Sequence, residues 1–108
     1  MTEDPMHQIA DRDALLARRL ALVANVSTLT AEALRLNQKR AGVEMDVLRL
    51  ELEIGRSAAS AQLVQDLREA QERAAAAMLA CAACEQRIVA AESDVEDVDR
   101  SLAATEDN

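Results

Sequence analysis

Two series of apolar residues with the heptad spacing of a coiled coil constrain the fold of this chain more than any other feature. In the first half, one position recurs every seven residues, at Leu15, Leu22, Leu29, Leu36, Val43 and Leu50. A second position follows each of these by four residues, at Arg19, Val26, Ala33, Arg40, Val47 and Ile54. The second half has its own series, in which spacings of four and three alternate, at Leu63, Leu67, Ala70, Ala74, Ala77, Cys81, Cys84, Ile88, Ala91, Val95, Val98 and Leu102. Repeats of this kind are typical of helices that pack side by side in a coiled coil, and we call these positions the seam.

The two series are out of phase, and the break between them falls at residues 55–60. Gly55 can take the left-handed conformation that ends a helix, and Ser57 or Ser60 can cap the next helix with its hydroxyl. Asp4 followed by Pro5 suits an N-cap and a first helical position. We therefore predict a helix over residues 5–54, a turn over 55–58, a helix over 58–104 and an acidic tail over 105–108.

These elements predict a single all-α domain over residues 1–108, a long antiparallel helical hairpin that associates into a four-helix bundle. The alternative is one continuous helix in a coiled coil. A second apolar stripe, which includes Met45 and Leu52, runs through Gly55 with helical spacing. A single glycine costs a helix only about 1 kcal/mol, so the sequence leaves this alternative open.

Composition excludes several fold and function classes. The chain is 50% hydrophobic, but it has no aromatic residue, two glycines and one proline, so the turn residues and strand formers of a β or α/β fold are missing. Aromatic side chains commonly line ligand pockets, and their absence argues against an enzyme, a cofactor or a small-molecule substrate. The net charge of −8 disfavours nucleic acid and anionic membrane surfaces.

Three sequence features bear on the cellular location of the protein: its apolar stretches, its N-terminal residues and its cysteines. The longest uninterrupted apolar stretch, 74–84, is too short to span a bilayer, so no membrane insertion is expected. Residues 1–5 are acidic and unlike a classical signal peptide. Two cysteines without a secretion signal suggest reduced thiols, and we expect a cytoplasmic protein.

Few residues could carry chemistry. Cys81 and Cys84 have the CxxC spacing of redox motifs and of half a zinc site. They lie on the seam, however, where thiols behave as small buried hydrophobes, and the single histidine, His7, is far away in sequence. We therefore predict no metal site and treat the two thiols as core residues, with a redox role as the alternative. Arg19 and Arg40 also lie on the seam, and we expect their stems to cover it while their guanidinium groups reach water.

Two features suggest surfaces for partners. Acidic residues gather near the C-terminus, where they form a solvated end or a docking surface for a basic partner, at Glu92, Asp94, Glu96, Asp97 and Asp99. The first helix also carries apolar residues beyond its seam, at Leu16, Leu20, Val23, Leu34, Met45, Leu48 and Leu52. A two-helix hairpin leaves these exposed, and we predict that they form an interaction face for a second copy or another protein.

The sequence therefore predicts a non-enzymatic assembly module that binds proteins, such as an adaptor, stalk or chaperone of a secretion or motor complex. The bias toward Ala, Arg, Asp and Val fits a GC-rich bacterial genome. Two alternatives remain: a redox or zinc sensor that uses Cys81 and Cys84, and a hairpin secreted without a signal. In its size and central turn the chain superficially resembles the WXG-type family of such secreted hairpins, which implies export. The turn region reads Glu53-Ile54-Gly55, however, and contains neither the tryptophan nor the later tyrosine of that family.

Overall fold

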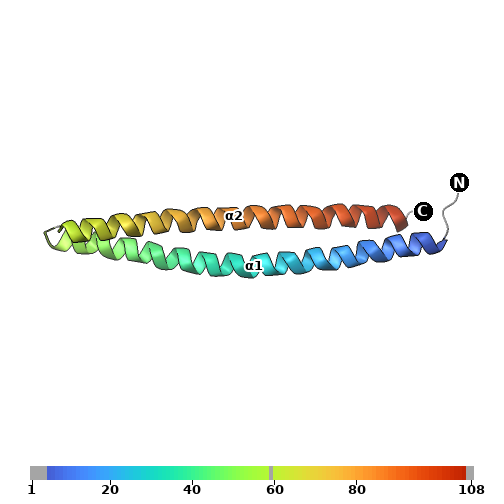
Figure 1. The fold of residues 1–108 in the computed structure, drawn as a ribbon, viewed down its shortest axis with the longest axis horizontal. Helices are drawn as coiled ribbons and strands as arrows, with labels where there is room; N and C mark the ends of the chain where they lie inside the picture. The colour runs from blue at the N-terminus through green and yellow to red at the C-terminus, as the bar shows by residue number, and fades with distance from the viewer. Residues whose placement is uncertain (1–4, 59, 107–108) are drawn as a thin grey trace. The chain divides into compact units, whose positions relative to one another are not determined.

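The protein is an all-α helical hairpin, shown as a computed structural model that describes residues 5–58 and 60–106. Helix α1 spans Pro5–Arg56 and helix α2 spans Ala61–Glu106, with a short turn between them (Figure 1). The hairpin predicted from the out-of-phase seams is confirmed, and the alternative of one continuous helix is wrong. Two stripes that lie on different sides of one rod can face each other only if the chain reverses direction.

The end of α1 differs from the predicted turn at residues 55–58. Gly55 lies inside α1, and neither glycine has a positive φ, so the prediction of a left-handed Gly55 is wrong. The helix ends at Arg56 instead, where the Ser57 backbone N–H and the Ser57 hydroxyl both donate to the Glu53 carbonyl, at 3.2 and 3.0 Å. These bonds satisfy a carbonyl that the helix end would leave unpaired.

The start of α2 is set by Ser60. Its hydroxyl accepts a hydrogen bond of 3.0 Å from the Leu63 backbone N–H, and its carbonyl accepts one of 3.1 Å from the Val64 N–H. This is the geometry of a serine N-cap, so of the two predicted caps Ser60 is the one used. The predicted start at residue 58 is therefore too early. The predicted end at residue 104 is also wrong, because α2 continues to Glu106.

Helix α1 begins at Pro5, which fits a proline at the first helical position. The predicted cap Asp4, together with Glu3 and Asp107, lies outside the described residues. Of the predicted acidic tail, Thr105 and Glu106 are helical and the remainder is outside the described part of the chain.

The helical conformation of Gly55 gives a direct prediction. A Cβ added at Gly55 meets nothing within 4 Å, so Gly55→Ala should raise the free energy of unfolding by about 0.5–1 kcal/mol through helix propensity. Gly42→Ala is the matched control, because Gly42 is also helical with open space around its Cα. Urea denaturation followed by circular dichroism measures both. A loss of stability for Gly55→Ala alone would mean that α1 ends before this residue.

The chain forms two compact units, each built from segments of both helices. Unit 2 is Ala31–Glu85, in which the end of α1 and the start of α2 lie antiparallel on either side of the turn (Figure 1). Unit 1 combines Met1–Thr30 with Gln86–Asn108, so that the start of α1 pairs with the end of α2.

The core of each unit is the predicted seam, since every seam residue is buried or half-buried. Unit 2 buries Ala70, Ala77, Cys81 and Cys84, whereas unit 1 buries Leu29, Ala91, Val98 and Leu102. Most of these side chains are small and belong to α2. A short side chain at a helix interface lies beneath the longer side chains opposite, so it is covered completely while the longer ones keep an exposed edge.

Candidate functional site

The predicted interaction face of α1 is solvent-exposed along its whole length. All seven of its residues are among the exposed large apolar side chains, from Val23 at 38% to Leu20 at 72%. Leu16, Leu20 and Val23 belong to unit 1, and the other four belong to unit 2.

In unit 1 the apolar stripe is longer than the sequence analysis recognised. Met6 and Ile9 are also exposed, at 77% and 61%. They continue the stripe backwards from Leu16 in steps of three and four, with Asp13 as the one polar interruption. Residues at this spacing share one side of a helix. The spacing was visible in the sequence and could have revealed both residues.

The acidic cluster of α2 is divided between different sides of the helix. Glu92 and Glu96 line a shallow depression with Val23, Val26 and Val95. Val23, the last residue of the apolar stripe in unit 1, therefore borders these two carboxylates. Glu92, Glu96 and Asp99 follow one another at spacings of four and three, which places all three on the same side of α2.

The remaining carboxylates of the predicted docking end lie elsewhere. Asp97 lines a different depression with Leu15, Arg18, Val98 and Ser101, and it forms an ion pair with Arg100. Asp94 is two residues from both Glu92 and Glu96, so it points about 200° away from each around the helix. The predicted acidic end is thus not one surface, because the helical period distributes it around α2.

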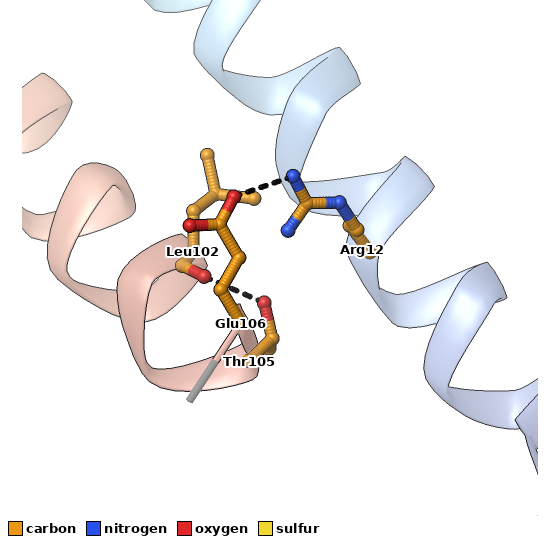
Figure 2. Close-up of polar contacts among 4 residues, drawn as sticks. All are labelled: Arg12, Leu102, Thr105 and Glu106. Atoms are coloured by element: carbon orange, nitrogen blue, oxygen red, sulfur yellow. Dashed lines mark hydrogen bonds and ion pairs between the residues drawn. The ribbon is translucent and has the colours of Figure 1, made fainter. Parts of the chain in front are cut away.

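Two arginines of α1 reach across to carboxylates of α2 in unit 1. Arg12 Nη2 lies 2.8 Å from Glu106 Oε1, and Figure 2 shows this pair next to the hydrogen bond from the Thr105 hydroxyl to the Leu102 carbonyl. Arg19 Nε lies 2.6 Å from Asp99 Oδ1. The two arginines are seven residues apart, as are the two carboxylates, so the same contact is repeated in successive heptads.

The seam arginines are paired as well as exposed. The pKa of Arg19 is raised, first by its hydrogen bond to Asp99 and then by the charge of that carboxylate. In unit 2, Arg40 Nε lies 2.8 Å from Glu44 Oε1, and this hydrogen bond is the main reason that the pKa of Arg40 is raised. Both guanidinium groups are partly exposed, at 43% and 37% of the side-chain surface. The prediction that they reach water was therefore incomplete, since each is also paired with a carboxylate.

In unit 2, Leu48 is the one residue of the predicted interaction face that borders a groove between the helices. Leu48 lines this groove with Val47 from α1 and with Ala74, Ala75 and Met78 from α2. Met78 is 51% exposed and was not part of the predicted face. The other exposed apolar residues of α2 that the sequence analysis missed are Val64, Leu79 and Val89. As in α1, each of these residues can be recognised in the sequence as an apolar residue that lies outside the seam positions.

Cys81 and Cys84 form no disulfide within the described residues, and they are 3% and 2% exposed. Their burial on the seam supports the interpretation as core residues, because a thiol has to reach solvent or another chain to react. Within residues 5–58 and 60–106, no group of three or more His, Cys, Asp or Glu residues is arranged to hold a metal ion. His7 is exposed and its Nε2 lies 3.6 Å from Asp11 Oδ2.

Each helix contains an 18-residue window that is long and apolar enough to cross a membrane. Charged residues interrupt each of these stretches, so the uninterrupted apolar runs within them are short. The core helices of soluble proteins and signal sequences meet the same criterion, so two such helices are weak evidence for a membrane protein.

No family model matches the sequence. The search of curated proteins and the search of solved structures likewise found no match. A functional proposal for this protein therefore depends on its own residues.

Proposed function

We propose that the protein is a non-enzymatic coiled-coil assembly module that binds other protein chains along the sides of its helices. The observation that supports this most strongly is the exposure of large apolar residues along α1 in both units. Association removes such surface from water, and each Å² of apolar surface buried contributes about 25 cal/mol. Contiguous apolar surface on a soluble protein commonly marks an interaction site.

The unit 2 part of this face is suited to a second copy of the chain. Leu34, Met45, Leu48 and Leu52 are each more than half exposed, and Leu48 lies at the groove that Met78 completes. Two hairpins that pack these surfaces together form a four-helix bundle, in which apolar positions of all four helices face one core.

In a cell, such a module would act as an adaptor, stalk or chaperone of a larger assembly. The composition fits a GC-rich bacterial genome, and small helical hairpins serve these roles in bacterial secretion and motor complexes. This part of the proposal depends on analogy between folds, and a cytoplasmic location belongs with it.

Light scattering of the purified protein tests self-assembly. We expect a mass that is a multiple of the 11.7 kDa chain at micromolar concentration. Leu34→Asp/Leu48→Asp should reduce it to one chain without loss of helical circular dichroism, because both side chains are exposed within the hairpin and charge on them opposes burial against a partner.

The matched control adds the same two charges on another side of unit 2. Ala76 and Ala83 are exposed and do not line the groove, so Ala76→Asp/Ala83→Asp should keep the oligomeric mass. A single-chain mass for the unmodified protein would overturn the self-assembly proposal. Dissociation by the control pair would show that the wrong face has been assigned.

A further inference from the structure

We propose that unit 1 binds an amphipathic helix of a partner protein with lysine or arginine along one edge. This inference rests on the proposed function and adds the chemistry of the partner. The binding surface, which we call the mixed face, consists of Leu16, Leu20 and Val23 on α1 and Glu92 and Glu96 on α2. Its two halves meet in the depression that Val23 shares with both glutamates.

The apolar half of the mixed face has the form of a helix-binding ridge. Leu16, Leu20 and Val23 are 43%, 72% and 38% exposed and follow the spacing of four and three that defines one side of a helix. Ridges of this spacing fit into the grooves of another helix. An amphipathic helix that lays its apolar side against such a surface is a recurring mode of peptide recognition.

The acidic half gives the partner its charge. Asp99 and Glu106, on the same side of α2, are already paired with Arg19 and Arg12. Within the described part of the chain, no ion pair is formed by Glu92 or Glu96. Two carboxylates beside an apolar stripe attract a helix whose apolar side is flanked by cations, and they disfavour one flanked by carboxylates.

A second copy of this chain is a poor occupant of the mixed face. In unit 1, Arg12 and Arg19 are engaged with their own α2 carboxylates, and Arg18 lies at the other depression with Asp97. The chain as a whole carries a net charge of −8, so a second copy brings more carboxylates than cations to this face. A different, basic protein supplies the complementary charge better.

The test uses the full-length protein and a fluorescently labelled synthetic peptide in which leucines at helical spacing are flanked by lysines. A second peptide carries glutamates in place of the lysines. We expect saturable binding of the lysine peptide with one peptide per hairpin, weaker binding at high salt, and at least about tenfold weaker binding of the glutamate peptide. Fluorescence anisotropy measures each affinity.

A matched pair of carboxylate variants and a comparison of leucine variants separate specific binding from general attraction to an acidic protein. Glu92→Gln/Glu96→Gln should lower the affinity for the lysine peptide by about tenfold. Asp94→Asn/Asp97→Asn changes the net charge by the same amount and should alter this affinity by less than about twofold. Leu16→Ala/Leu20→Ala should lower the affinity for the lysine peptide by at least about tenfold. Leu79→Ala tests a leucine on α2 that is 71% exposed and should leave binding unchanged.

Equal losses for the two carboxylate pairs would overturn the proposal, because they would indicate attraction by net charge alone. Equal affinity for the lysine and glutamate peptides, or no binding of either, would also overturn it. Light scattering of the same samples measures their oligomeric mass, so that failure of peptide binding can be told apart from failure of self-assembly. Peptide binding can fail while the protein remains an oligomer, and binding by a single-chain species would contradict only the self-assembly proposal.

Discussion

Leu29→Asp is expected to lower the free energy of unfolding by about 4 kcal/mol, the cost of leaving a charge buried without a partner. Leu29 is 3% exposed and is the only buried residue among the described residues of α1, whose other seam residues are half-buried. Its carboxylate replacement would lie on a seam whose neighbouring positions, Val26 and Ala33, are apolar. Urea denaturation monitored by circular dichroism measures the loss.

Leu20→Asp is the matched control for this substitution. Leu20 belongs to the same helix and the same unit, but its side chain is 72% exposed. A charge there stays in water, so the stability should change by no more than about 0.5 kcal/mol. Equal destabilisation by the two variants would contradict the assignment of seam and surface in unit 1.

Ala70→Leu should destabilise the hairpin by about 1–3 kcal/mol, because a larger side chain has to force the packed helices apart. Ala70 is 0% exposed, the lowest value in the core. Leucine and alanine are both strong helix formers, so the loss would come from packing between the helices rather than from α2 itself. Thermal and urea denaturation both measure it.

Ala76→Leu provides the control for overpacking, because Ala76 lies on α2 and is exposed. Its effect should stay within about 0.5 kcal/mol. If Ala70→Leu were as mild as Ala76→Leu, the helices in unit 2 would be separated by more space than the structure shows.

The turn shows where sequence reasoning reached its limit. The change of phase between the seams correctly placed a reversal near residues 55–60, but glycine and serine are each compatible with several local roles. The sequence predicts that Gly55 ends the first helix, whereas the helix continues through it and Ser60 starts α2. Local propensities differ by about 1 kcal/mol or less, so they do not fix the residue at which the turn begins. The structure shows that local hydrogen bonds of Ser57 and Ser60 mark its two ends.

The sequence by itself determined which residues face the partner helix, because heptad spacing fixes the direction of each side chain around the helix axis. Every seam position, and the exposure of Leu20, Leu34 and Leu48, follows from that period. Only the tertiary structure decided which carboxylate meets each arginine. Arg12 and Arg19 pair with Glu106 and Asp99 and leave Glu92 and Glu96 beside the apolar stripe. Those contacts depend on how the two helices are aligned along their lengths, and a repeat that looks the same after every seven residues does not specify that alignment.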